Sequence, residues 1–157
     1  MIVNGTATSP GEADQMSKEM THAEAAEGVR AAIAVYTQAL DDGRTDDVVA
    51  TYCPDGACEI PGMGTHRGHR ALRDAYSRWE PKRPQRHLVL NTVVTEWSDT
   101  GATAISDVVF LLLGDSGWAI QLVGRYHDTL HHDNGTWRFH HRVATFVTED
   151  SPHKGTA

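Results

Sequence analysis

Four long segments with the composition of β-strands follow one another in the second half of the chain. They cover residues 86–97, 102–113, 118–132 and 136–148, and the turn sequences SDTG, GDSG and DNG separate them. Asn134-Gly135 is the clearest hairpin signal, because both residue types accept the positive φ of a tight turn. Strands of this length are longer than usual and predict a strongly curved antiparallel sheet.

Helical patterns dominate the region before these strands. The first begins with a capping box, carries apolar residues at steps of three and four, and covers 21–43. A second, short helix is predicted over 45–52, followed by an extended piece at 57–60. A Gly-rich turn at 61–68 leads into a third helix at 69–79. Three helices packed on one face of a curved sheet form an α+β fold, a cone with a pocket inside.

One domain is the default for 157 residues. We expect a flexible N-terminal tail at 1–21, a single domain at 22–148 and a C-terminal tail at 149–157, because the ends lack an apolar period. The longest apolar stretch, 108–113, is too short to span a membrane, and residues 1–21 do not resemble a signal peptide. A cytoplasmic protein is therefore predicted.

The formal net charge of −7 argues against nucleic acid as a partner, because binding to phosphates requires a positive surface. Cys53 and Cys58 are too few for a disulfide framework and lack the second pair typical of a zinc site, so they are interpreted as unpaired thiols. Ten histidines include the pairs at 131–132 and 140–141. Neighbouring strand residues face opposite ways and no HExxH motif is present, so no metal site is predicted.

Two polar residues interrupt the apolar segment at 86–97. Alternation on a strand places His87 and Asn91 on the same face as Val89 and Val93. A histidine in such a position is more often a satisfied core residue than a catalyst, and an asparagine can simply bond to a neighbouring strand. A functional interpretation therefore needs a partner for the imidazole.

Several short motifs appear in the same order as the predicted elements. They are Ala39-Leu40-Asp41, GMGTHRG at 62–68, His87-x-x-x-Asn91, Gly124-Arg125-Tyr126 and Trp137-Arg138-Phe139. In this order the chain resembles the SnoaL-like branch of the NTF2-like superfamily over roughly residues 22–148. It is most similar to the scytalone dehydratase group, which includes bile-acid 7α-dehydratase and hexachlorocyclohexane dehydrochlorinase. The resemblance implies a cone-shaped barrel of the NTF2-like kind, with no cofactor.

The resemblance also implies site residues. Asp41 and His87 match a carboxylate–imidazole pair in which the neutral imidazole takes a proton and the carboxylate orients it. Tyr36 and Arg142 match residues that polarise a carbonyl oxygen and hold a carboxylate or assist a departing hydroxyl. Tyr52 matches a further pocket tyrosine.

Alternatives remain open for several of these residues. Tyr36 lies on the buried stripe of its helix, where plain packing is an equal explanation. Strand alternation can place His141 in the pocket in place of Arg142, unless a bulge intervenes. Asn91 and Tyr126 are expected to line the pocket without an assigned chemical role.

The resemblance predicts a cofactor-independent lyase that dehydrates a hydroxylated hydrophobic ring compound such as a steroid or polyketide. The alternatives are an isomerase or cyclase of the ketosteroid isomerase or polyketide cyclase kind, and a non-catalytic binder of small ligands. We also expect a homo-oligomer, with a trimer favoured over a dimer. An outer sheet face bearing Phe110, Leu111, Leu112 and Leu113 would otherwise be exposed.

Overall fold

The computed structural model describes residues 19–147. Its elements are α1 (His22–Asp41), α2 (Thr45–Ala50), β1 (Tyr52–Ile60), β2 (Gly64–Arg67), α3 (Gly68–Arg78), β3 (Gln85–Ser98), β4 (Gly101–Gly114), β5 (Gly117–Asp133) and β6 (Thr136–Phe146). The α+β class, the three helices and the four-strand meander are as predicted. Most of the expected N-terminal tail and all of the expected C-terminal tail lie outside the described residues.

The sequence at the start of α1 fixes its first turn. The Thr21 hydroxyl accepts a hydrogen bond from the Glu24 backbone N–H (3.2 Å), and the Glu24 carboxylate accepts one from the Thr21 backbone N–H (2.8 Å). This reciprocal pair satisfies donors that the helix itself leaves without partners. The helix ends at Asp41, and Gly43 follows with a φ of +68°. The end of α1 therefore holds the Asp41 side chain at a defined point beside the sheet.

The sheet contains six strands in the order β2-β1-β6-β5-β4-β3. Strands β3 to β6 form an antiparallel meander, whereas β1 pairs with β6 in parallel and with β2 in antiparallel orientation. The predicted antiparallel meander is present, and the parallel pairing of β1 with β6 adds a feature that the sequence did not predict. The sheet is strongly curved, but β2 and β3 are its two free edges, so it does not close into a complete barrel.

Two local predictions were wrong around β1. Tyr52 begins a strand and does not end the second helix, because it pairs with Phe139 while the Phe139 backbone N–H donates to the Thr51 carbonyl (2.9 Å). Pairing with a distant strand thus outweighs the local helical pattern. Part of the predicted Gly-rich turn forms β2, which pairs with the second half of β1.

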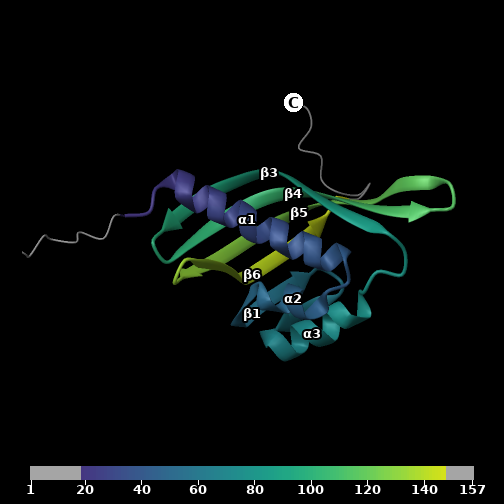
Figure 1. Cartoon of the computed structure of the whole chain (residues 1–157), viewed down its shortest axis with the longest axis horizontal. Coiled ribbons are helices and arrows are strands. Elements are labelled where there is room, and N and C mark those ends of the chain that lie inside the picture. Colours follow the sequence, from purple (N-terminus) through teal and green to yellow (C-terminus); the bar gives the residue numbers. More distant parts are fainter. Residues whose placement is uncertain (1–18, 148–157) are drawn as a thin grey trace, which may run out of the picture.

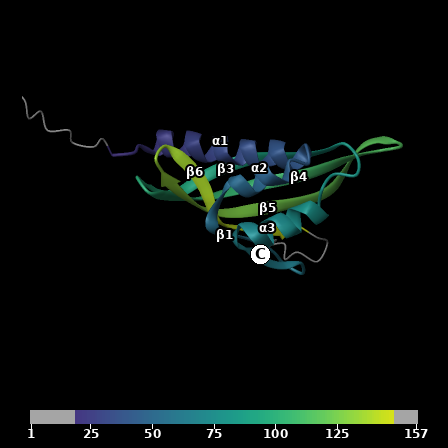
Figure 2. The same ribbon diagram turned by 60° about the horizontal axis from the view of Figure 1, so that its bottom comes forward.

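Figure 1 shows α1 running along the sheet, with α2 and α3 at the end of the molecule where β1 lies. Figure 2 shows α1 and α3 at different levels, with α2 between them. The core contains the buried stripe of α1 and the inner faces of the strands. Its members include Val29, Ile33, Tyr36, Tyr52, Leu72, Leu130 and Phe139.

The expectation that four consecutive residues of β4, Phe110 to Leu113, lie on its outer face was wrong for two of them. Phe110 and Leu112 point into the cavity described below, and only Leu111 and Leu113 face outward beside Ile120 and Trp118 of β5. The reason is strict alternation of side chains along the strand. Exposed apolar residues of β5 extend this outer surface, with Trp118 and Ile120 exposed by 51% and 64%.

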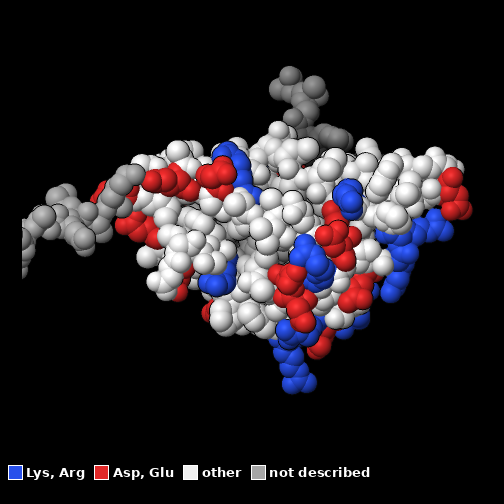
Figure 3. All heavy atoms as spheres, in the orientation of Figure 1, with Lys and Arg blue, Asp and Glu red and all other residues white. Residues whose placement is uncertain are grey.

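Charged side chains of both signs are interspersed over the face that carries α1 and α2 (Figure 3). Ion pairs join several of them, such as Arg73 with Asp46 (2.8 Å) and Arg44 with Asp42 (3.5 Å). Among residues 19–147, no helix is both long and apolar enough to cross a membrane.

Candidate active site

A cavity of about 620 Å³ lies between the curved sheet and the helices. Its walls are mainly apolar, and its size falls within the range typical of small-molecule sites. Residues from α1, β1, β4, β5 and β6 contribute to the walls, including Leu40, Ile60, Val108, Phe110, Leu122 and Ala144. Tyr36, Tyr76, His87, Tyr126 and Arg142 are among the polar residues that line it.

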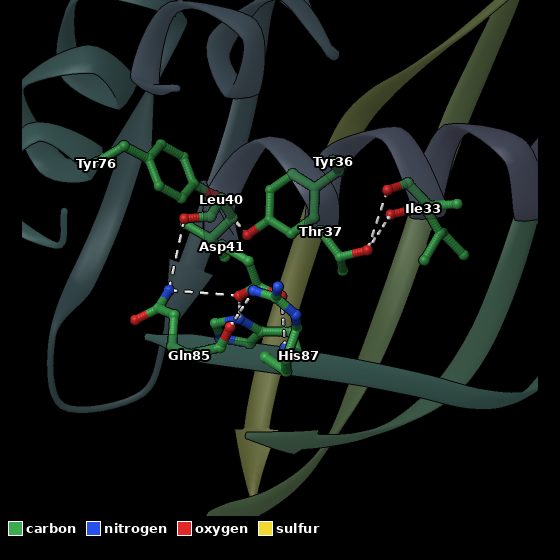
Figure 4. Close-up of polar contacts among 10 residues, drawn as sticks. Ile33, Tyr36, Thr37, Leu40, Asp41, Tyr76, Gln85 and His87 are labelled. Atoms are coloured by element: carbon green, nitrogen blue, oxygen red, sulfur yellow. Dashed lines mark hydrogen bonds and ion pairs between the residues drawn. The ribbon is translucent and has the colours of Figure 1, made fainter. Parts of the chain in front are cut away.

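Asp41 and His87 meet at the edge of this cavity. Asp41 Oδ1 lies 2.6 Å from His87 Nδ1, and Asp41 Oδ2 accepts a hydrogen bond from the His87 backbone N–H at 2.8 Å. Figure 4 shows the carboxylate at the end of α1 directed at Gln85 and His87 on β3. The Gln85 amide makes a longer contact of 3.4 Å with Asp41 Oδ1. The predicted pair is thus brought together, well within the ~4 Å that a dyad requires.

The other imidazole nitrogen is free to act. The His87 ring stacks on Phe110, with 4.6 Å between ring centroids and 22° between planes. Its side chain is 15% exposed, and that of Asp41 6%. Within the described part of the chain, His87 Nε2 has no hydrogen-bond partner. Since the Asp41 carboxylate favours a proton on Nδ1, Nε2 is left as a proton acceptor beside the cavity.

Three tyrosine hydroxyls form a chain behind the dyad. Tyr76 Oη lies 2.9 Å from Tyr36 Oη and 2.8 Å from Tyr52 Oη. Burial raises the pKa of Tyr36, against the opposing charge of Arg142, and raises the pKa values of Tyr52 and Tyr76 well above the ordinary value. All three therefore remain neutral hydroxyls and can donate hydrogen bonds.

Arg142 is fully buried and balanced by one carboxylate. Its Nε and Nη2 donate to the two oxygens of Asp128, each at 2.7 Å, and both side chains are 0% exposed. The guanidinium also lies 4.0 to 4.3 Å from the ring centroids of Tyr36, Tyr126 and Phe139. Its Nη1 is buried and has no hydrogen-bond partner among the described residues. Arg142 is also among the residues that line the cavity.

A bulge in β6 decides between Arg142 and His141. Leu130 pairs with Phe139, but the preceding residue of β5, Thr129, pairs with His141, so His140 is an extra residue. Phe139 and Arg142 consequently both face inward, and His141 lies 3.3 Å from Glu59. If β6 alternated regularly with His140 in register, the three steps from Phe139 to Arg142 would have put them on opposite faces.

The remaining predicted residues differ in their positions. Tyr126 lines the cavity, whereas Tyr52 is not among its lining residues and bonds to one of them, Tyr76. The expectation that Asn91 lines the cavity was wrong. Asn91 has a φ of +54° at an irregularity in β3, is exposed, and donates to Asp107 (3.0 Å). The break in alternation turns its side chain away from the face of His87.

Two residues of the site were missed from the sequence. Tyr76 lies on α3, where it is buried with Leu72 and Ala75, and this spacing of three and four marks the inner face of the helix. Asp128 lies between the buried residues Tyr126 and Leu130 at steps of two. A carboxylate that shares an inward face with apolar residues requires a cationic partner. This pattern could have predicted from the sequence that Asp128 pairs with a buried cation.

The SnoaL-like domain family matches residues 21–143 of the chain. Among curated proteins, none matches significantly. Among solved structures, the chain is similar to Rv3472 from Mycobacterium tuberculosis, a protein of unknown function. The two are 26% identical with a TM-score of 0.72, over 80% of this chain and 73% of that one.

Two structures from Novosphingobium aromaticivorans share the fold. A candidate scytalone dehydratase is 20% identical with a TM-score of 0.69, over 78% of this chain and 83% of the other. An NTF2-like protein with a cystatin-like fold is 20% identical with a TM-score of 0.74, over 82% of this chain and 86% of the other. These likenesses establish the architecture.

Proposed function

Because the chain belongs to the SnoaL-like domain family, we propose that it is a lyase that dehydrates a hydroxylated hydrophobic ring compound such as a steroid or polyketide. One observation carries the proposal. The Asp41 carboxylate holds His87 at 2.6 Å beside a largely apolar cavity of about 620 Å³, with the far imidazole nitrogen free. The likeness in fold to a candidate scytalone dehydratase agrees with it.

In the proposed reaction, His87 Nε2 takes a proton from a carbon next to a carbonyl group. The electron pair of the broken C–H bond forms a C=C bond while the neighbouring C–O bond breaks. The imidazolium, stabilised by Asp41, then gives its proton to the departing hydroxide, which leaves as water. The net change is the loss of one water molecule, and His87 returns to its starting state.

Negative charge develops on the carbonyl oxygen of the substrate during this step, and a hydrogen-bond donor is needed to stabilise it. The Tyr36 hydroxyl is neutral, lines the cavity and is held by Tyr76 at 2.9 Å. Arg142 keeps Nη1 without a partner among the described residues, while its Nε and Nη2 donate to Asp128. Preorganised donors of this kind are often the largest contribution to catalysis in a site shielded from water.

The test is a panel of hydroxysteroids and polyketide-like cyclic alcohols, incubated with the purified protein and analysed by mass spectrometry. We expect a product lighter by one water molecule. The variant His87→Gln should lose turnover but keep its affinity for the same compound in calorimetry, because glutamine retains polarity but cannot act as a base. Turnover by the variant at the rate of the native protein would reject His87 as the base.

The paired hydroxyls of Tyr36 and Tyr76 also favour a second candidate, an isomerase. A donor pair on a carbonyl oxygen stabilises an enolate, and the protonated His87 can return the proton to a different carbon. In that case the product has an unchanged mass but a different retention time and ultraviolet spectrum. Equal binding by native protein and His87→Gln, with no product from either, would instead identify a non-catalytic binder.

We also propose that the chain forms a homo-oligomer through the outer face of its sheet. Leu88, Val109 and Val123 are neighbours across β3, β4 and β5, and Leu111 lies beside Ile120. Leu88, Val123 and Ile120 are exposed by 47%, 42% and 64%. A contiguous apolar surface of this kind is typical of a protein–protein contact.

A further inference from the structure

We propose that Cys53, His131 and His140 bind a zinc ion at a site separate from the cavity. The three side chains come from β1, β5 and β6, which are neighbours in the sheet with β6 in the middle. A sulfur and two nitrogens from them lie within 4.8 Å of one another. This is the one group of three potential metal ligands found within residues 19–147.

The bulge in β6 brings the two histidines together. His131 follows the inward-facing Leu130, and His140 follows the inward-facing Phe139, so both imidazoles lie on the side away from the core. Their rings stack in parallel, with 4.3 Å between centroids and 10° between planes. A ring nitrogen of each histidine lies within 4.8 Å of the other and of the Cys53 sulfur.

Cys53 faces the same group from the other side of β6. Its Sγ contacts the Arg138 carbonyl oxygen at 3.8 Å. The register between β1 and β6 shifts between Tyr52 and Ala57. Cys53 lies within this irregular part of β1, beside His140 of β6. A bound ion would replace the proton of the Cys53 thiol.

An unsatisfied nitrogen marks the site. His140 Nδ1 is buried and has no hydrogen-bond partner among the described residues, a costly state for a polar atom. The nearest carboxylate oxygen, Oδ1 of Asp55, is 3.9 Å away, beyond hydrogen-bond distance. A bound cation would satisfy both the nitrogen and the exposed Asp55 carboxylate, which adds negative charge beside the site.

The distances fit a tetrahedral ion after a small adjustment. Zinc bonds of about 2.0–2.3 Å place neighbouring ligand atoms about 3.3–3.8 Å apart. The present separations of up to 4.8 Å therefore need to shrink by about 1 Å, and His131 is exposed and free to turn. One sulfur with two imidazole nitrogens is a ligand set that suits zinc, with the fourth position open to Asp55 or water.

The zinc site would be structural for the fold and independent of the proposed chemistry. None of its three ligands lines the cavity. The ion would link β1 and β5 to the strand between them at the point where two registers are interrupted. We expect it to stabilise the folded chain, because it binds only where the three strands are assembled.

Zinc binding is measured by calorimetry on the purified, metal-stripped full chain, with ZnCl₂ as the probe. We expect one ion per chain and a higher melting temperature with zinc. Replacement of zinc by CoCl₂ should give a thiolate-to-cobalt charge-transfer band. Cys53→Ser should abolish that band, and Cys58→Ser, which changes the other thiol of β1, should retain it.

Zinc affinities of two histidine variants provide a second test of the site. His131→Gln should lower zinc affinity at least about 100-fold, because even loss of a residue outside the ligand set costs about 10- to 100-fold at metal sites. His127→Gln changes an exposed histidine of the same strand and should leave the affinity unchanged. His131 is exposed, so its variant keeps the fold if Cys53→Ser does not. Equal loss in His131→Gln and His127→Gln, survival of the cobalt band in Cys53→Ser, or no zinc binding by the native chain would overturn the site.

Discussion

The carboxylate of Asp41 holds His87 at two points, its imidazole Nδ1 at 2.6 Å and its backbone N–H at 2.8 Å. The two contacts use different carboxylate oxygens, so neither can be kept if the carboxylate rotates. Asp41 thereby fixes the ring tautomer and anchors the start of β3 to the end of α1. Asp41 therefore orients the proposed base and also contributes to the packing of α1 against β3.

Replacement of Asp41 by Asn should lower kcat by about 10²- to 10⁴-fold, because an amide no longer stabilises the imidazolium and can impose the wrong tautomer. The measurement is steady-state kinetics on whichever alcohol the panel identifies, with KM expected to change little. Asp42→Asn alters the next carboxylate of the chain, which is exposed, and should keep full activity. Similar losses in both variants would mean that Asp41 has no special role.

Removal of the carboxylate from the buried pair, as Asp128→Ala, should destabilise the fold by about 3–5 kcal/mol, because it leaves the Arg142 charge buried without a partner. Urea unfolding followed by circular dichroism measures this. The matched control is Asp107→Ala, whose partner Arg125 is 53% exposed and whose pair should contribute only about 0–1 kcal/mol. Equal free energies of unfolding for both variants would contradict the assigned burial of Arg142.

All four tyrosines of the chain have raised pKa values, mainly because of burial. The native protein should therefore show no tyrosinate absorbance as the pH passes 10.0, the ordinary value. The unfolded chain loses these protons first, so the free energy of unfolding should fall as pH rises above that value and be fully present below it. Ultraviolet titration should show the tyrosines ionising together with alkaline unfolding. A gradual tyrosinate signal from a folded protein, as judged by circular dichroism, would argue against the hydroxyl chain.

Ile120→Lys should dissociate the proposed homo-oligomer, because it places a charge in the outer apolar surface. Sedimentation velocity of the native protein and the variant gives the assembly state, with a trimer favoured for the native protein. Val35→Lys substitutes another exposed apolar residue, on α1 and 55% exposed, and should leave assembly intact. A native protein that sediments as a monomer would contradict the proposed homo-oligomer.

Local patterns in the sequence were sufficient for the helices and the meander. The capping box at Thr21, the stripe of α1 and the Asn134-Gly135 turn each act over a few residues, so they can be recognised without the fold. The parallel pairing of β1 with β6 joins residues far apart along the chain. No local pattern encodes such a pair, which is why Tyr52 was assigned to a helix.

The site was predictable where family resemblance and helix geometry agreed, as for Asp41 and His87. Strand alternation alone did not predict it where a strand is irregular. Asn91 turns outward at one irregularity, and Arg142 turns inward after another. An extra residue in a strand leaves no mark in its composition, so the faces of residues beyond it cannot be read from alternation.

His140 is a supernumerary residue in β6, since Leu130 pairs with Phe139 and Thr129 with His141. Deleting it would leave an ordinary alternating strand in which Phe139 and Arg142 still face inward. A single-codon insertion into an ancestral gene could therefore add the third metal ligand without disturbing the arginine of the cavity. Binding of zinc and turnover of substrate would then be separable traits, free to be gained and lost independently along a lineage.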